Sequence, residues 1–227
     1  MINISKMSKY YGEYPAVIDV SFNISKGESI GLLGPNGAGK STTMKVMTGF
    51  TPPTSGNVNI GGHDIIKNSI DVRKLIGYLP ESVPLYTDMT VSDYLKYMGS
   101  LRGMNKNISK RVDEVISLTS LNQYKNVLIS KLSKGYRQRT GIAQAILHKP
   151  KILILDEPTI GIDPVQVVET RKLIQNLGED HTLILSSHIL PEVTSICKRV
   201  LVIHEGKIVA DDTPENLSNR LQTSNLC

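Results

Sequence analysis

The stretch at residues 34–42, which reads GPNGAGKST, constrains the fold of this chain more than any other feature. It matches the pattern G-x-x-x-x-G-K-[ST] of a phosphate-binding loop, in which glycines let successive backbone N–H groups face phosphate oxygens. The apolar run Ser29–Leu33 before it predicts a buried strand, and residues 40–48 after it predict a helix that Gly49 ends. A strand, a glycine-rich turn and a helix in this order predict a nucleotide-binding site.

The whole loop is expected to contact the nucleotide. Its residues are Gly34, Pro35, Asn36, Gly37, Ala38, Gly39, Lys40, Ser41 and Thr42. Lys40 supplies a positive charge for the β- and γ-phosphates, and the Ser41 hydroxyl is suited to Mg²⁺. An ordinary glycine-rich turn is the alternative, but four fixed positions arise by chance in roughly one chain in a hundred of this size. Nucleotide binding is therefore the favoured interpretation.

An acidic pair after a second apolar run supports this interpretation. Residues 151–155 predict a buried strand, and Asp156 and Glu157 follow it directly. Carboxylates at the carboxyl edge of a parallel sheet lie where ligands bind. We expect Asp156 to hold Mg²⁺ with Ser41, and Glu157 to polarise an attacking water. Two solvated charges at a strand end are the alternative, which becomes weaker beside a phosphate-binding loop.

The composition fits one α/β domain with an insertion, since the chain has 227 residues of which 40% are hydrophobic. No apolar run approaches the ~20 residues that span a bilayer, and the N-terminus lacks the apolar core of a signal peptide, so we expect a cytoplasmic protein. Cys197 and Cys227 show no metal-ligand or redox spacing, which indicates plain thiols. The net charge of +5 suits an anionic partner but is common among ordinary domains.

The hydrophobic pattern separates a core from a helical segment. The expected strands cover residues 2–4, 18–24, 29–33, 58–60, 152–155, 182–185 and 200–203. The expected helices cover residues 40–48, 91–102 after a capping box of Thr90 and Asp93, 108–116, 135–147, and a segment that begins at Pro164 with Asp163 as cap. A turn at residues 10–15 leaves Tyr11 free to stack on a planar group. We predict a single domain with its core at residues 1–81 and 150–227 and a helical insertion at about 82–149.

Five further stretches occur in the order typical of the ATP-binding cassette ATPases that power membrane transporters, and essentially the whole chain resembles that family. The matching stretches are Tyr11, residues 77–81, residues 132–136 in place of the LSGGQ signature, residues 162–164 of the D-loop, and residues 187–188 of the switch. The resemblance implies a phosphate-loop NTPase fold of mostly parallel sheet with flanking helices, an N-terminal antiparallel β region and an inserted helical subdomain. ATP and Mg²⁺ are the implied cofactors.

The resemblance also implies roles for residues that spacing alone leaves open. Tyr11 would stack on adenine, and Glu157 with His188 would catalyse hydrolysis. Ser133 and Gly135 would bind the γ-phosphate held by another subunit, which Asp163 would contact. That subunit is a second copy of the chain or a paralogous ATPase. A separate membrane-spanning permease would hold the protein at the cytoplasmic face of the membrane, and nucleic acid is not expected.

Three residues depart from the family pattern. Glu81 stands where most members have glutamine, and we expect it still to sense Mg²⁺. In the signature, Lys134 replaces the first glycine and Tyr136 replaces the glutamine, which leaves Ser133 and Gly135. Two orientations of Lys134 stay open, toward a phosphate or toward solvent.

Residues 77–86 and 132–139 look most like the subfamily that exports drugs, lipid-linked glycans or peptides, and the short segment 213–227 predicts little or no regulatory tail. The alternative function is a non-transport relative acting on nucleic acid or the ribosome. Such proteins usually add a long coiled coil or a second cassette, and the basic residues here are not gathered into an arm. A phosphate-loop kinase or GTPase would leave the signature stretch unexplained.

Overall fold

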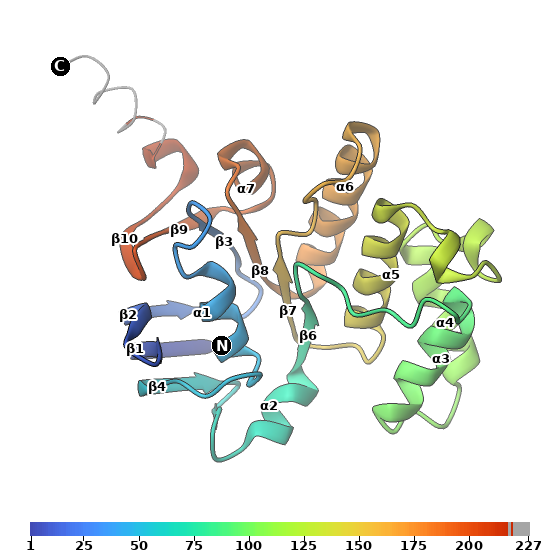
Figure 1. The fold of residues 1–227 in the computed structure, drawn as a ribbon, viewed down its shortest axis with the longest axis horizontal. Helices are drawn as coiled ribbons and strands as arrows, with labels where there is room; N and C mark the ends of the chain where they lie inside the picture. Colours follow the sequence, from blue (N-terminus) through green and yellow to red (C-terminus); the bar gives the residue numbers. More distant parts are fainter. Residues whose placement is uncertain (218, 220–227) are drawn as a thin grey trace.

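The computed structural model describes residues 1–217 and residue 219, whose strands form two sheets (Figure 1). The first, antiparallel sheet has the order β2-β1-β4-β5 and consists of β1 (Ile2–Tyr11), β2 (Tyr14–Ile24), β4 (Ser55–Ile60) and β5 (His63–Asp64). The second has the order β10-β9-β3-β8-β7-β6 and consists of β3 (Ser29–Leu33), β6 (Ile76–Leu79), β7 (Ile152–Asp156), β8 (Thr182–Ser187), β9 (Arg199–His204) and β10 (Lys207–Asp212). Its neighbouring strands are parallel except β9 and β10. The expectations for Cys227 and for most of the C-terminal segment fall outside the described residues.

The second sheet is buried on both faces, which explains the unbroken apolar run of β7. Ile152 and Ile154 point to one face, where they join the core that includes the first sheet. Leu153 and Leu155 point to the other face and join a core that continues into the helices. Successive strand residues alternate between faces, so a strand covered on both sides needs apolar residues throughout.

Helices fill the space on both sides of this sheet. They are α1 (Lys40–Met47), α2 (Ser69–Leu75), α3 (Val91–Leu101), α4 (Ile108–Leu118), α5 (Lys134–Ile146), α6 (Pro164–Asp180) and α7 (Leu190–Ile196), with short 3₁₀ turns at Asn122–Tyr124 and Ile129–Lys131. α1 lies between the two sheets, because its buried Met44, Val46 and Met47 belong to the same core as both. α6 and α7 cover the opposite face through Ile174, Leu177 and Val193.

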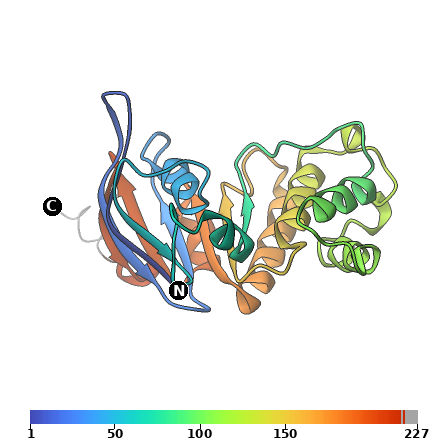
Figure 2. The same cartoon turned by 90° about the horizontal axis from the view of Figure 1, so that it is seen from below.

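The helices α3, α4 and α5 form a second lobe beside the sheets, seen at the right of Figure 2. α3 begins as predicted, since Thr90 Oγ1 accepts a hydrogen bond from Asp93 N at 3.1 Å. Asp163 caps α6 in the same way, with Gln166 N donating to its Oδ1 at 3.0 Å. Such caps satisfy backbone donors that the first helical turn leaves free, and each contributes about 1 kcal/mol. The mixed α/β fold is confirmed, and the division into core and insertion stays a prediction.

The predicted turn at residues 10–15 was wrong in extent. β1 continues through Tyr11 and β2 begins at Tyr14, so only Gly12 and Glu13 form the turn. Aromatic residues favour strands, and the cross-strand pair Tyr11 and Tyr14 extends the ladder to the tip of the hairpin. The helices α2 and α7 had no expectation from the sequence, because each is only seven residues long and too short to show a helical period.

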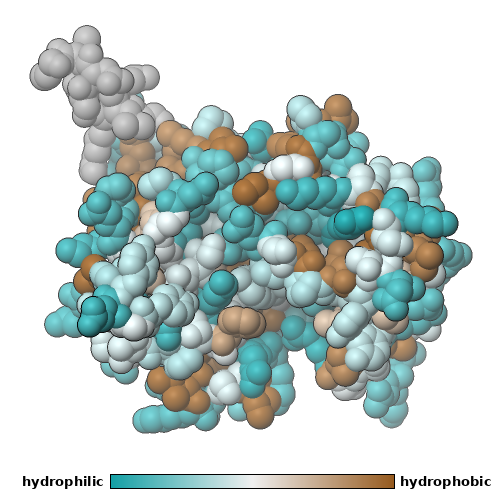
Figure 3. All heavy atoms as spheres, viewed as in Figure 1, coloured by the Kyte–Doolittle hydropathy of each residue, from teal (hydrophilic) through white to brown (hydrophobic). Residues whose placement is uncertain are grey.

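The surface in Figure 3 carries its hydrophobic side chains in separate groups among hydrophilic ones. In the part of the chain that the structure describes, no helix combines the length and apolar character needed to cross a membrane.

His148 lies just after the end of α5 and connects this helix to β6 of the second sheet. Its Nε2 atom lies 3.0 Å from Arg102 Nη1 and 3.1 Å from the carbonyl oxygen of Ile76. Burial, together with the charge of Arg102, lowers the pKa of His148 to about 4. The imidazole is therefore neutral at pH 7.

We predict that this histidine makes the fold sensitive to acid. The unfolded chain binds a proton at His148 near pH 6.5 and the folded chain only near 4, so stability present above pH 6.5 is lost as the pH falls toward 4. Between pH 7 and 5 the wild type should lose about 1 kcal/mol more unfolding free energy than His148→Gln. Urea titrations at both pH values measure this. The exposed His204 gives the control, His204→Gln, which should behave as the wild type; equal losses in His148→Gln and wild type would contradict the prediction.

Candidate functional site

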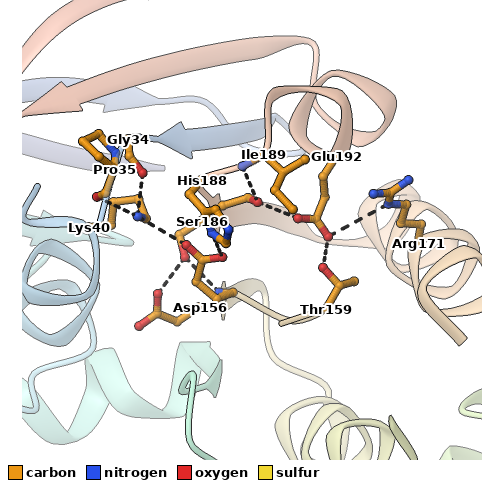
Figure 4. A network of polar contacts seen from close by, with 12 residues as sticks. Gly34, Pro35, Lys40, Asp156, Thr159, Arg171, Ser186, His188, Ile189 and Glu192 are labelled. Carbon is orange, nitrogen blue, oxygen red and sulfur yellow. Dashed lines mark hydrogen bonds and ion pairs between the residues drawn. The ribbon is translucent and has the colours of Figure 1, made fainter. Parts of the chain in front are cut away.

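The phosphate-binding loop connects β3 to α1, and α1 begins at Lys40. Gly39 adopts φ 107°, and a Cβ there would lie 2.6 Å from the carbonyl oxygen of Ala16, so the position requires glycine. Lys40 is 6% exposed, and its Nζ donates to the carbonyl oxygens of Gly34 at 2.7 Å and Pro35 at 3.1 Å (Figure 4). These bonds hold the lysine ammonium against the first two residues of the loop.

A cavity of about 380 Å³ opens above this loop. Its wall consists of Tyr11, Tyr14, Ala16, Asn36, Gly37, Gly39, Lys40, Ser41, Thr42, Glu81 and Glu157. Tyr11 stands at the tip of the β1–β2 hairpin with half of its side chain exposed, and it therefore presents a ring to the cavity that holds the loop. Three of the predicted loop residues are not in the described lining of this cavity. Pro35 and Ala38 line a neighbouring cavity, and the carbonyl oxygen of Gly34 accepts a hydrogen bond from Lys40.

The acidic pair lies at the end of β7, as predicted. Asp156 pairs in register with Ser186 of β8, and Ser186 Oγ donates to Asp156 Oδ1 at 2.6 Å. The same hydroxyl accepts from the backbone N–H of Glu157 at 3.0 Å. Glu157 has φ 48°, a left-handed conformation that is strained for a residue other than glycine. Ser186 thus fixes the turn that aims the Glu157 carboxylate.

The Glu157 carboxylate is buried between Lys40, the first residue of α1, and His188, which directly follows β8. Its Oε1 lies 3.3 Å from Lys40 Nζ, and its Oε2 lies 2.9 Å from His188 Nδ1. The side chain is 6% exposed, whereas that of His188 is 38% exposed. Lys40 and Glu157 line the cavity, whereas its described lining does not include His188, which contacts Glu157. A base, a cation and an imidazole together can orient and deprotonate a water.

The three residues predicted to bind metal also share a cavity. Ser41, Glu81 and Asp156 all line a space of about 500 Å³ next to the first one, and Ser41 and Glu81 border both. A hydroxyl and two carboxylates are the hard oxygen donors that Mg²⁺ prefers, with phosphate oxygens completing its coordination. The residues present therefore fit Mg²⁺.

Tyr78 lines the same space, and sequence reasoning missed it. Its hydroxyl is buried and has no hydrogen-bond partner among the described residues. Burial, with the nearby charges of Asp156 and Glu81, raises the pKa of Tyr78, so the group stays an uncharged O–H donor. In the sequence, Tyr78 stands two positions before Pro80 in the stretch 77–81. Nothing in that stretch indicates a buried hydroxyl without a partner.

The signature residues lie elsewhere, on the helical lobe. Ser133 is the N-cap of α5, and its Oγ accepts from Tyr136 N and from Gln166 Nε2, both at 3.4 Å. Gly135 is buried so closely against Gln166 that a Cβ there would lie 1.5 Å from the amide oxygen. The described lining of the nucleotide cavity includes neither of these residues, nor Asp163.

Two departures from the family signature have visible contacts. Lys134 is exposed, and its Nζ lies against the backbone of Gly161, 2.3 Å from where a Cβ of that glycine would stand. The Tyr136 ring packs on Tyr124 with centroids 4.0 Å apart, and Arg139 lies 5.5 Å from its centroid. The contacts with Gly161 and Tyr124 tie the start of α5 to other parts of the same chain, whereas Arg139 belongs to α5 itself.

Comparison with known proteins decides the family. The sequence profile described as ABC transporter matches residues 17–160. The chain belongs to the ABC transporter family. It is 38% identical over 97% of its length to the linearmycin resistance ATP-binding protein LnrL of Bacillus subtilis, covering 72% of that protein. It is 36% identical over 97% of its length to the bacitracin transport ATP-binding protein BcrA of Bacillus licheniformis, again covering 72%.

A solved structure agrees with these relatives. CbiO1 from Clostridium perfringens, part of the ABC transporter complex cbiONQ, superposes with a TM-score of 0.86 at 28% identity, over 98% of this chain and 92% of that one. The family assignment made from the motifs is thus confirmed. This ABC transporter chain is an ATP-binding subunit that hydrolyses ATP.

The partnerless hydroxyl of Tyr78 gives a stability prediction. A buried hydroxyl without a hydrogen bond is unfavourable, so Tyr78→Phe should unfold at the same temperature as the wild type or higher, with a gain of up to about 1 kcal/mol. Tyr94→Phe is the matched control, because the Tyr94 hydroxyl donates to Gln144 Oε1. That variant should lose about 1 kcal/mol. Thermal unfolding without nucleotide measures both; a loss in Tyr78→Phe as large as in Tyr94→Phe would refute the prediction.

Proposed function

We propose that this ABC transporter subunit drives export through a separate membrane-spanning permease, at the cytoplasmic face of the membrane, by hydrolysing ATP between two cassettes. The observation that carries the proposal is the Glu157 carboxylate held between Lys40 and His188 at the nucleotide cavity. The names of the linearmycin resistance and bacitracin transport relatives support export of antibiotic-like compounds. They also favour transport over the alternative of work on nucleic acid or the ribosome.

The cavity supports a specific orientation of ATP. Tyr11 stacks on the adenine at the hairpin tip, and the backbone N–H groups of residues 36–42 bind the phosphates. Lys40 binds the β- and γ-phosphates as a point charge. The γ-phosphate then lies beside Glu157 and His188, because Lys40 already contacts the Glu157 carboxylate. Glu157 takes the proton from the attacking water, and His188 contacts the γ-phosphate and orients Glu157.

Ser41, Asp156 and Glu81 would hold Mg²⁺ in the adjoining cavity. When bound, the metal neutralises charge that develops on the β- and γ-phosphate oxygens. Ser186 keeps the Asp156 carboxylate in place through its hydrogen bond.

The site is completed by a second cassette, a copy of this chain or a paralogue. Ser133 and Gly135 stand at the start of α5, on the lobe away from the chain's own cavity, where backbone N–H groups and the helix dipole attract an anion. These residues bind the γ-phosphate of the facing chain, and Asp163 contacts that chain. ATP therefore joins the two cassettes, and hydrolysis releases them.

The permease contact lies beside Glu81. Phe50 is 76% exposed and Tyr86 is 50% exposed, and Phe50 lines the cavity that Glu81 and Pro84 also line. Exposed aromatic side chains around a concave surface favour docking of another protein. Because Glu81 borders both cavities, it links that surface to the nucleotide.

The role of Glu157 is tested by Glu157→Gln. This variant should bind ATP and dimerise with it, while the hydrolysis rate falls by about 100-fold or more, because the amide cannot accept the proton. Size-exclusion chromatography with ATP and a phosphate-release assay measure the two effects. The exposed Glu179 supplies the control, and Glu179→Gln should match the wild type in both. A Glu157→Gln protein that stays monomeric or hydrolyses ATP normally would disprove the assignment.

The export proposal is tested by capturing tagged Glu157→Gln protein with ATP from detergent-solubilised membranes of its own cells. Recovery of a membrane protein with several spans supports the proposal and identifies the subunit that holds the substrate. Recovery of soluble factors or nucleic acid alone would instead support the alternative function.

The metal role of Glu81 gives a separate prediction. Glu81→Ala should raise the Mg²⁺ concentration for half-maximal hydrolysis by about 10-fold, and Glu81→Gln, which restores an oxygen ligand, should raise it less. Titrating Mg²⁺ at saturating ATP measures this, with Glu179→Ala as control. If Glu81→Ala keeps the wild-type Mg²⁺ dependence, Glu81 does not sense the metal.

A further inference from the structure

A second buried carboxylate, Glu192, lies on the side of His188 that faces away from Lys40 (Figure 4) and is not in the described lining of the nucleotide cavity. It belongs to the first turn of α7 and is 1% exposed. Both of its oxygens have partners. Its Oε2 accepts from Ser187 Oγ at 2.5 Å, and its Oε1 accepts from Thr159 Oγ1 and lies 4.0 Å from Arg171 Nε (Figure 4).

The two hydroxyl donors come from the two turns that carry the site. Ser187 is the last residue of β8 and directly precedes His188. Its Oγ also accepts from the backbone N–H of Ile189 at 3.0 Å, so this side chain shapes the turn on both sides of the histidine. Thr159 lies in the other turn, two residues after Glu157 and four before Asp163.

A buried carboxylate is costly unless hydrogen bonds and cations compensate for its lost hydration. Arg171 at 4.0 Å gives incomplete compensation, so the hydroxyls of Ser187 and Thr159 matter. Each hydroxyl has a single proton to donate, and both point to Glu192. Displacing either turn breaks a charge-assisted hydrogen bond inside the protein, and such bonds are about twice as strong as neutral ones.

We infer that Glu192 is a positioning residue that fixes His188 relative to Glu157 and links the His188 turn to the loop leading to Asp163. It acts through Ser187 and Thr159 and does not touch the nucleotide. The inference rests on the proposed function for the roles of His188 and Asp163. When two cassettes close on each other, Asp163 contacts the facing chain. Through Thr159, Glu192 and Ser187, this contact then affects the position of His188 in the chain that carries Asp163.

A role in stability alone makes a different prediction. If Glu192 only stabilised the fold, its loss would lower the unfolding temperature and reduce hydrolysis independently of His188. A residue that acts through His188 has no further effect once the imidazole is gone. A double-mutant cycle separates the two cases, since residues in one network give non-additive effects.

The experiment compares wild type, Glu192→Gln, His188→Ala and the double variant, with Glu179→Gln as control. Glu192→Gln should lower kcat for ATP about 10- to 100-fold, because catalysis is lost when a group is misplaced by about 1 Å, while KM stays within about 2-fold. In the double variant, kcat should equal that of His188→Ala. A multiplied loss in the double variant, or a normal kcat in Glu192→Gln, would overturn the inference.

Two further readouts keep the result clear. Thr159→Val and Ser187→Ala each remove one donor and should each show a smaller loss of kcat at unchanged KM, which tests the network if Glu192→Gln does not fold. If all these variants and Glu192→Gln hydrolyse ATP as the wild type does, the inference is wrong. If His188→Ala alone keeps full kcat, the role proposed for His188 fails, and the inference falls with it.

Discussion

The contact of Glu157 with Lys40 and His188 is the interaction on which the site depends. The three residues follow β7, β3 and β8, and β8 lies between the other two strands in the sheet. Parallel strands end at the same edge, so their following turns converge there. Removing one partner of a buried ion pair such as Lys40 and Glu157 costs about 3–5 kcal/mol, so this contact holds the phosphate-binding loop against the acidic turn. The contact of His188 with the same carboxylate adds the histidine turn to this unit.

This strand order also explains which parts of the site the sequence predicted. The phosphate-binding loop, the acidic strand end and the cap at Asp163 are local patterns, and each can be recognised within about ten residues. Ser186 and Glu192 are different, because their partners Asp156 and Thr159 are near only after β7 and β8 pair. A serine in an apolar strand and a glutamate in a short helix carry no local sign of such roles. The tertiary arrangement alone brings them together.

The signature shows how the fold accommodates departures from a family pattern. Tyr136 stands where glutamine is usual, and it packs on Tyr124 and beside Arg139 within its own lobe. Lys134 keeps its charge exposed while its end lies against Gly161, close to Asp163. Gln166 of α6 donates to Ser133 of α5. The start of α5 and the start of α6 are therefore in direct contact within one chain, and these are the two surfaces proposed to face a second cassette.

Coupling between distant groups requires an element with discrete arrangements rather than a merely contiguous path. In the inference drawn above, the hydroxyls around Glu192 form such an element, because each has one proton and its bond to the carboxylate is either made or broken. Ser187 Oγ meets this condition at the histidine turn, and Thr159 Oγ1 meets it in the loop before Asp163. If Asp163 is displaced by a facing chain, Thr159 moves with its loop, and Glu192 can keep both bonds only if Ser187 and His188 follow. Under this inference, the geometry proposed for catalysis depends on a surface outside the nucleotide cavity.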